Sequence, residues 1–584
     1  MSSATAFLPS ARVLDYDQET DQFTLTISAR DRDLAAQVAG MRFHKPTETW
    51  RGAPTLANAF ALRGVFGNAL DVTDAAYARV QGEVDNANTV QAWKDGDTVP
   101  PPHEGTEGLF PEQRPAAHAA ALQGYFLNGD DKGSGKTVMA AGAMNLAQPW
   151  PALVVATASM KYTWQAEVEK WCGVSVAVMG RTKGQRLAAI KAVADGEAQV
   201  LICGWEQLRL HSALAGYGSV RRTDAEKEPK ELNEIPWQAV IADEAHRAKN
   251  PKAKQTRALW EVSKSATFRW PLTATPITGN TIDLWGILHF MDPEAWPSRS
   301  KFIDRYVLTH VNHWGAMEDL GLNPRNEAEL RQILEPHYIR RKLDLPIKAL
   351  EPQFRFVDME GEQRRVYKQM ERESITQIDD RFLVAVGPLT VNTRLQQLAQ
   401  ATPVIDDDGE VIGMKRPSCK YDALVDLLEE MEGDPLVVFS DSRKLLQLCY
   451  SELTADKGPL TTEEVGRVYG GISEDERARD VAAFQDGKLK VILCSIMAAA
   501  EGITLTRAST LCFLNRSYRA VLNNQAEGRV LRHGQTRNVQ IIDIITRESE
   551  EYRVHESSAA KEQRLQDFHQ DEDWMPRVVP TETD

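Results

Sequence analysis

The sequence predicts an α/β protein with two lobes, each built on a parallel sheet. Two sets of short apolar segments support this prediction, one after Leu109 and one after Asp434, and in both sets the segments alternate with helical stretches. Runs of buried β-branched residues between helices are typical of parallel sheets, because helices cover both faces. The segments are "ALVVAT", "QVLICG", "AVIADEA" and "RWPLTATP" in the first set, and "PLVVFSDS", "RVYGG", "VILCSI" and "TLCFLN" in the second.

The chain of 584 residues is long enough for about three or four domains. We expect the first to be a small α+β module, because "FTLTISA" alternates as a half-buried strand does and "MRFHKPTETWRG" resembles a hairpin that turns near Lys45. The expected layout is a module at 1–82, a polar linker at 83–108, a first lobe at 109–284, a mostly helical inter-lobe region at 285–415, a second lobe at 416–560 and an acidic tail at 561–584.

Composition limits the possible functions. The hydrophobic share is 42% and the charged share 26%, as in globular proteins. A net charge of -15 argues against a protein coated with nucleic acid, so any DNA surface must be a local basic stripe. The six cysteines are scattered, which disfavours a disulfide framework or a zinc site. No run of 18 apolar residues occurs, and we expect a soluble intracellular protein without a membrane partner.

The stretch "GDDKGSGKTVMA", residues 129–140, has the features of a phosphate-binding loop. Gly133 and Gly135 leave the backbone free to turn its amide groups toward a phosphate at a helix start. Lys136 would then reach the β- and γ-phosphates, and the Thr137 hydroxyl would bind Mg²⁺. Asp130 stands where the strict pattern has glycine, so on this motif alone an ordinary glycine-rich turn stays open.

Two further motifs carry chemistry. "AVIADEAHRAKN" places Asp243 and Glu244 directly after an apolar strand, where open α/β sheets bind ligands. Asp243 can hold a metal ion and Glu244 can deprotonate water, although acidic residues are also common at helix starts. In "NNQAEGRVLRHGQT", Arg529 and Arg532 fall three apart on an expected helix and can stabilise a transferring phosphoryl group. A surface salt-bridge helix is the alternative.

The order of the motifs carries a family resemblance. "GDDKGSGKT", "VVATASMKYTWQAEVEKW", "CGWEQL", "DEAHRAKNPKAKQTRAL", "LTATPITGN", "VVFSDSRK", "AAAEGITL" and "QAEGRVLRHGQT" together resemble the Swi/Snf-type ATPases of helicase superfamily two, over about Leu109 to Thr546. The resemblance implies two RecA-like lobes that bind ATP and Mg²⁺ and move along double-stranded DNA, usually without separating its strands. The family carries aspartate at position 130.

The resemblance implies roles residue by residue. Gln113 in "LFPEQR" matches the glutamine that reads adenine, and Glu244 matches the acid that activates water. The implied nucleotide contacts are Asp130, Gly133, Ser134, Gly135, Lys136 and Thr137, and the implied metal ligands are Thr137 and Asp243. The implied arginine-finger motif contains Gln525, Arg529 and Arg532, which join Lys136 and Glu244 in catalysis. The implied DNA-binding or coupling residues are Ser159, Lys161, Trp205 and Thr273, with Arg340, Arg341 and Lys342 of "HYIRRKLDLP".

This sequence departs from the family pattern at several positions. Lys132 and Ser134 replace an apolar pair, and residues 518–520, Tyr-Arg-Ala, replace Trp-Asn-Pro. Ala499 and Ala500 stand where glycines are common, which leaves the coupling contacts there open. The N-terminal "RFHKPTETWRGAP" resembles the HARP-type module of annealing helicases, and the compact chain suits a bacterial or phage protein, hence a cytoplasmic one, or a nuclear one if eukaryotic.

We therefore expect a DNA-stimulated ATPase that translocates on double-stranded or forked DNA as a monomer, with replication or repair proteins as its protein partners. Three alternatives stay open: a strand-separating DNA or RNA helicase, an ATP-gated scaffold, and the motor part of a defence complex. Binding should be salt-sensitive and nearly blind to sequence, because the implied contacts are to phosphates.

Overall fold

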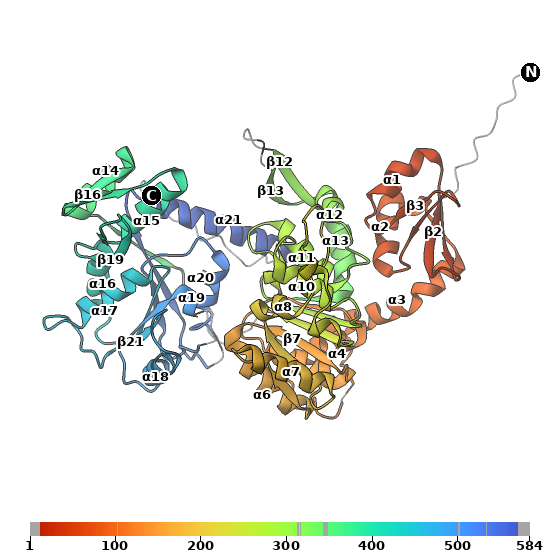
Figure 1. Cartoon of the computed structure of the whole chain (residues 1–584), viewed down its shortest axis with the longest axis horizontal. Helices are drawn as coiled ribbons and strands as arrows, with labels where there is room; N and C mark the ends of the chain where they lie inside the picture. Colours follow the sequence, from red (N-terminus) through yellow and green to blue (C-terminus); the bar gives the residue numbers. More distant parts are fainter. Residues whose placement is uncertain are drawn as a thin grey trace, which may run out of the picture. The chain divides into compact units, whose positions relative to one another are not determined.

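The computed structural model describes residues 12–101, 103–311, 315, 317–342, 349–499, 503–532 and 534–569. The chain divides into two compact units, and the division falls between Lys342 and Leu343 (Figure 1). Within the described residues, none of the helices combines the length and the apolar character that a membrane span requires.

The first unit begins with a small α+β module, as the sequence predicts. Its five-stranded sheet has the order β3-β4-β2-β1-β5. The expected hairpin is present as β3 and β4, and "FTLTISA" supplies β2. The bounds are β1 (Val13–Asp17), β2 (Gln22–Thr26), β3 (Arg42–His44), β4 (Thr49–Gly52), β5 (Asp71–Val72), α1 (Arg32–Gln37), α2 (Leu56–Phe66) and α3 (Asp74–Asp95).

The module packs against the lobe that follows it. The Lys301 ammonium on α12 (Arg299–Tyr306) donates to the carbonyl of Val38 at 3.1 Å. At the contact between α2 and α13 (Glu327–Leu334), a Cβ on Gly64 would lie 2.2 Å from a carboxylate oxygen of Glu329. A larger residue at position 64 would therefore have to displace the Glu329 carboxylate, which pairs with Arg305.

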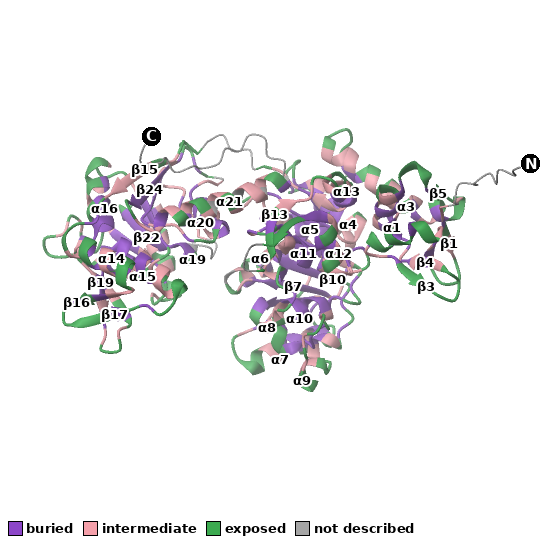
Figure 2. Cartoon of the chain, turned by 90° about the horizontal axis from the view of Figure 1, so that it is seen from above, coloured by how far each residue is buried: buried purple, intermediate pink, exposed green. Residues whose placement is uncertain are grey.

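The lobe of the first unit is a seven-stranded, wholly parallel sheet with the order β14-β6-β11-β10-β7-β9-β8. Its central strands are completely buried (Figure 2), so their near-continuous apolar sequences follow from helices on both faces. The strands are β6 (Leu127–Asn128), β7 (Ala152–Ala156), β8 (Val176–Val178), β9 (Val200–Gly204), β10 (Ala239–Asp243), β11 (Phe268–Leu272) and β14 (Tyr338–Ile339). The main helices are α4 (Arg114–Gln123), α5 (Lys136–Ala147), α6 (Lys161–Cys172), α7 (Lys183–Ala194), α8 (Trp205–His211), α10 (Lys254–Val262) and α11 (Leu284–Met291).

The second unit has its own parallel sheet, in the order β15-β24-β23-β20-β22-β21. The two-lobe α/β prediction is thereby confirmed, and all eight quoted segments contain strands of the two sheets. The strands are β15 (Gln353–Val357), β20 (Leu436–Ser440), β21 (Val465–Val468), β22 (Val491–Ser495), β23 (Thr510–Phe513) and β24 (Gln540–Thr546). The helices include α14 (Gly361–Glu373), α15 (Pro388–Gln400), α16 (Cys419–Glu430), α17 (Arg443–Leu453), α18 (Glu474–Gln485), α19 (Ile496–Ala499), α20 (Ala520–Glu527) and α21 (Glu551–His569).

Two expected boundaries differ from the structure. Residues 83–95, expected in a linker, form the second half of α3, which Thr73 caps at its start and left-handed Gly96 ends. The buried residues of α3 are only Ala76, Val80 and Val90. Because so little of the helix is buried, its sequence is mostly polar and resembles that of a linker. Residues 561–569 belong to α21 rather than to a tail, and residues 570–584 lie outside the described residues.

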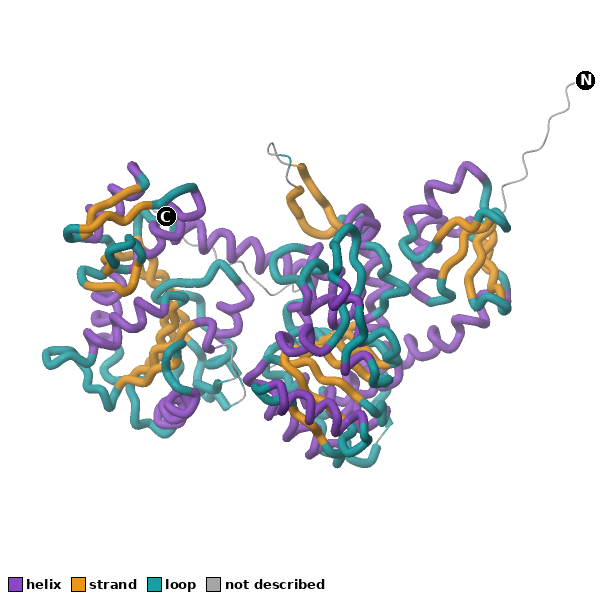
Figure 3. The backbone as a smooth tube through the Cα atoms, in the orientation of Figure 1, coloured by secondary structure: helices purple, strands orange, loops and turns teal. Residues whose placement is uncertain are grey.

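The region 285–415 is not mostly helical, because it contains three antiparallel hairpins and one strand of each lobe sheet (Figure 3). Left-handed Asp379 and Gly409 form two of the hairpin turns. The hairpins are β12 (Val307–Val311) with β13 (Met317–Leu322), β16 (Ile375–Ile378) with β17 (Arg381–Val384), and β18 (Thr402–Ile405) with β19 (Val411–Lys415). All six cysteines are free, as expected.

Candidate nucleotide site

The phosphate-loop sequence connects β6 to the first residue of α5. Gly133 and Gly135 have φ of 82° and 86°, a conformation that favours glycine. Gly135 also caps α5, so the loop amide groups lie at a helix N-terminus, where an anion is stabilised. The Lys136 ammonium donates to the carbonyls of Asp130 and Asp131 at 2.9 and 3.0 Å. Burial lowers its pKa, against the opposing effect of nearby carboxylates, among them Glu244.

Gln113 lies directly against this loop. Its side-chain amide donates to the Ser134 carbonyl at 2.9 Å and accepts from the Phe110 amide at 3.1 Å. A Cβ on Gly135 would lie 2.5 Å from the Gln113 amide nitrogen, so a larger residue there would have to displace the Gln113 side chain from the loop. The buried Ser134 hydroxyl has no partner among the described residues. A loop with an unsatisfied hydroxyl, a helix N-terminus and a lysine fits a polyphosphate.

Asp130 and Asp131 have partners in the protein. Asp130 is completely buried, and its carboxylate accepts from the Arg341 backbone amide at 2.8 Å and from the Arg341 guanidinium. Asp131 pairs with Arg340 at 2.7 Å. The pairing follows from the parallel contact of β14 with β6, which brings the two arginines beside the loop. Asp130 therefore anchors the loop instead of contacting nucleotide, and the two arginines are engaged by the loop instead of being available to DNA.

Asp243 is held at the carboxyl end of β10 by two tryptophans. The indole N–H of Trp164 donates to its carboxylate at 3.0 Å, and that of Trp205 donates to its carbonyl at 2.9 Å. The other carboxylate oxygen accepts from the Glu244 amide at 3.0 Å. Each oxygen keeps a further lone pair, and Thr137 is the second residue of α5, directly after the loop. Carboxylate and hydroxyl oxygens such as those of Asp243 and Thr137 are ligands of the kind that Mg²⁺ prefers.

The two carboxyl groups have opposite pKa shifts, because adjacent carboxylates do not both ionise readily. Burial and the charge of Glu244 raise the pKa of Asp243. Burial acts to raise the pKa of Glu244, but the hydrogen bond and charge of His246, with the charges of Lys132 and Lys136, lower it overall. Glu244 itself has a left-handed backbone, φ 50°. Such strain in a non-glycine residue is most common at functional sites.

His246 lies between two motifs. Its Nδ1 is 3.3 Å from a carboxylate oxygen of Glu244 and 3.2 Å from the hydroxyl of Thr273. Thr273 is completely buried after β11, and its backbone amide donates to the Asn128 carbonyl at 3.0 Å, directly before the phosphate loop. Thr273 and Trp205 are therefore placed for coupling to the nucleotide site rather than for contact with DNA.

The remaining residues expected to bind DNA differ in whether they are exposed. Lys161 is buried and its ammonium donates to the Met179 carbonyl at 2.5 Å, so it is not available to a phosphate. Ser159 lies in the turn before α6, and its side chain is outside what the structure describes. Lys342 is exposed. In "HRAKNPKAKQTR", the expected basic stripe is reduced by ion pairs, since carboxylates partner Arg247, Lys249 and Lys254.

The arginine-finger motif belongs to the second unit. Gln525 lies on α20 and is buried. The helix ends at Glu527 with Gly528 as its cap, and Arg529 and Arg532 follow it in non-helical residues. The expectation that the two arginines share one face of a helix is therefore wrong. The Arg532 guanidinium donates to the Ile503 carbonyl at 3.2 Å and to the Thr504 hydroxyl at 2.9 Å, and burial lowers its pKa.

Sequence reasoning missed Trp164, Arg340 and Arg341 as partners of the nucleotide site, and His246 as the link to Thr273. The available signal for Trp164 was chemical, because a buried indole N–H requires an acceptor. Among the described residues, no group of three or more His, Cys, Asp or Glu residues is placed to hold a metal ion together.

A parallel sheet with a phosphate loop after one strand and an Asp-Glu pair after another is the arrangement of ATP-hydrolysing phosphate-loop enzymes, and the chain is of that class. A model of the SNF2-related domain matches residues 69–402, more than half of the chain, and the helicase conserved C-terminal domain matches residues 419–534. The chain therefore belongs to the SNF2-related family, as the motif order predicts.

The individual relatives share only about a quarter of their residues with this chain. The chain is 25% identical over 477 residues to the putative ATP-dependent helicase/translocase YwqA of Bacillus subtilis, covering 78% of this chain and 47% of that protein. It is 25% identical over 474 residues to the DNA annealing helicase and endonuclease ZRANB3 of Bos taurus, covering 79% and 40%. The chain thus spans less than half the length of either relative. The solved Sulfolobus solfataricus SWI2/SNF2 ATPase core in complex with dsDNA matches with 24% identity and a TM-score of 0.36, covering 82% of this chain and 96% of that chain.

Proposed function

We propose that the chain uses ATP hydrolysis to translocate along double-stranded DNA. The observation that carries the proposal is that Asp243 and Glu244 each contact side chains from neighbouring motifs. Trp164 and Trp205, from the segments after β7 and β9, hold Asp243, while His246 connects Glu244 to Thr273. A movement of these segments would therefore reach the carboxylates directly, which is the connection that a DNA-stimulated ATPase needs.

The residues present fit ATP and Mg²⁺. Gln113 would orient the adenine end, while the loop amides and Lys136 would hold the phosphates. Thr137 and Asp243 would hold Mg²⁺, which when bound neutralises phosphate charge. Glu244 would orient the attacking water and accept its proton, and its lowered pKa keeps it ionised for that task. Arg529 and Arg532 would stabilise charge on the transferred phosphoryl group.

We further propose that the physiological substrate is duplex or forked DNA, that the chain acts as a monomer, and that strand annealing or fork remodelling is its task. The name of ZRANB3, an annealing helicase, and the small α+β module with the HARP-like "RFHKPTETWRGAP" support this choice. Contacts to phosphates would make binding strongly dependent on salt.

ATP hydrolysis by the purified chain tests the proposal, measured alone and with duplex DNA, forked DNA, single-stranded DNA and RNA. Glu244→Gln should abolish turnover, while Glu234→Gln, a change at an exposed acid before β10, should leave it intact. Stimulation by duplex or forked DNA supports translocation. Stimulation by RNA alone would indicate an RNA helicase, and no turnover with any nucleic acid would indicate an ATP-gated scaffold; either result contradicts the proposal.

A further inference from the structure

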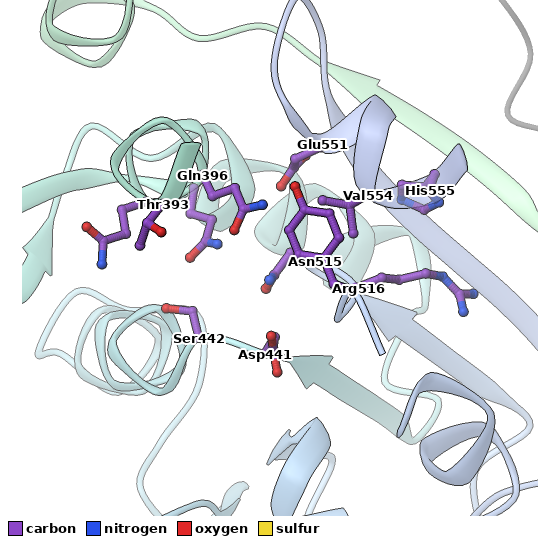
Figure 4. A pocket seen from close by; sticks show the side chains of 12 residues that line it. Thr393, Gln396, Asp441, Ser442, Asn515, Arg516, Glu551, Val554 and His555 are labelled. Atoms are coloured by element: carbon purple, nitrogen blue, oxygen red, sulfur yellow. The ribbon is translucent and has the colours of Figure 1, made fainter. Parts of the chain in front are cut away.

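The second unit contains a polar cavity that the nucleotide chemistry does not use. Its volume is about 290 Å³, near the lower limit of the roughly 300–1,000 Å³ of ligand pockets. Four segments line it: α15, the residues after β20, the residues after β23, and the start of α21 (Figure 4). We call it the lobe-two pocket.

The pocket lies where ligands of parallel α/β sheets bind. β20 has β22 on one side and β23 on the other, and the chain runs from β20 first to β21 and β22 and later to β23 and β24. The strand order therefore reverses at β20 and β23. The crevice outside the carboxyl ends of the two strands at such a reversal is the usual ligand site.

Two deeply buried side chains that line the pocket carry oxygens without a partner among the described residues. Gln400 is 6% exposed, and its amide oxygen accepts no hydrogen bond. Glu551 is 5% exposed; one carboxylate oxygen accepts from Lys420 at 2.6 Å and from the Thr546 amide at 2.8 Å, while the other has no partner. Such acceptors are costly unless a donor reaches them, so the pocket favours a ligand with several N–H groups.

The charges favour a cation. Asp441 lies below Glu551 in the view of Figure 4, and its carboxylate accepts a hydrogen bond from Ser517. The Arg516 guanidinium adds no net positive charge, because it is buried against Asp543 at 2.6 Å and Glu527 at 2.9 Å. Glu551 is itself paired with Lys420, and the charge of Arg519 acts on Asp441. The four carboxylates Asp441, Glu551, Asp543 and Glu527 still exceed the three cations Lys420, Arg516 and Arg519 by one charge, so the pocket disfavours an anion.

We propose that the lobe-two pocket binds a guanidinium group, whose planar fork donates to the free oxygens of Gln400 and Glu551 and to Asp441. Tyr518, which also lines the pocket, offers a ring against which a guanidinium can stack. A guanidinium suits the site better than an ammonium because its five donors lie in one plane and reach acceptors on several walls at once. The group belongs either to a free guanidine compound or to an arginine of a protein partner.

Calorimetric titration of the full chain with agmatine tests the proposal, with arginine-containing and citrulline-containing peptides of one sequence as further arms. We expect saturable agmatine binding that Asp441→Asn weakens at least tenfold and Gln400→Met weakens severalfold. Asp456→Asn, a matched change at an exposed acid of the same unit, should have no effect. Tighter binding of the arginine peptide than of agmatine would identify a protein source, and the reverse a free compound.

Two results would overturn the proposal: no saturable binding of any guanidine, or binding that citrulline reproduces and that neither pocket variant weakens. Gln400→Met replaces a buried side chain whose amide oxygen has no partner among the described residues, so the variant should fold even if Asp441→Asn does not. Thermal unfolding of both variants against the parent chain identifies any loss caused by misfolding.

Discussion

Arg341→Ala should destabilise the first unit far more than the loss of an ordinary surface arginine. The substitution removes the guanidinium from the completely buried Asp130 carboxylate, while the backbone amide of residue 341 still donates to one oxygen. Removing one partner of a buried ion pair costs about 3–5 kcal/mol, and the retained hydrogen bond places the expected cost near the lower limit, about 3 kcal/mol. The control Arg247→Ala breaks an exposed pair with Glu206 and should cost only about 0.5 kcal/mol.

Urea unfolding followed by tryptophan fluorescence measures this difference selectively, because every tryptophan except Trp574 lies at or before residue 314. Adding Asp130→Asn to Arg341→Ala removes the unpaired buried charge, so the double variant should be more stable than Arg341→Ala alone. Equal costs for Arg341→Ala and Arg247→Ala would refute the anchoring of the loop by Asp130, and so would a double variant less stable than the single one.

Three further predictions follow from single contacts. Trp164→Phe removes the indole donor to Asp243 and should lower kcat/KM for ATP in the presence of Mg²⁺ by about 10–100-fold. The control is Trp171→Phe, which removes an indole bonded to Glu167 on the same helix and should leave kcat/KM nearly unchanged. Equal effects of the two substitutions would contradict the role of Trp164. Gln113→Ala should raise KM for ATP and reduce the preference for ATP over GTP, while Gln123→Ala at the other end of α4 serves as the control and should preserve both. Burial lowers the pKa of His337 to about 4, below its unfolded value near 6.5, so its contribution to stability is complete above pH 6.5 and falls by about 3 kcal/mol as the pH drops to 4; His337→Phe should flatten that profile in urea titrations, and an unchanged profile would exclude His337 as the cause.

The sequence predicts the longer buried strands well because apolar runs between helices have few other solutions. β6 and β14 have two residues each, too few for any periodic pattern, yet their contact brings Arg341 to Asp130, 211 positions away. The helix α20 ends before Arg529 because of how Gly528 and the following turn pack. The three-residue spacing of the two arginines gives no information about that packing.

In the nucleotide site, too, some features follow from the sequence and others do not. The motifs predict which residues surround the phosphate loop, since glycine, lysine and paired acids each have a specific chemical use there. They do not predict that Lys161 is buried against Met179 or that Trp164 bonds Asp243, because these partners lie on other segments. Local chemistry could therefore be predicted from the sequence, while partners distant along the chain could not.

Displacement of a third strand from a DNA triplex detects movement along duplex DNA without separation of the duplex strands, so it is the decisive assay for translocation. We predict that the chain removes the third strand when ATP is present, that the underlying duplex stays paired, and that Glu244→Gln removes nothing. A triplex that stays intact while ATP is hydrolysed, or a duplex that separates into single strands, would contradict this prediction.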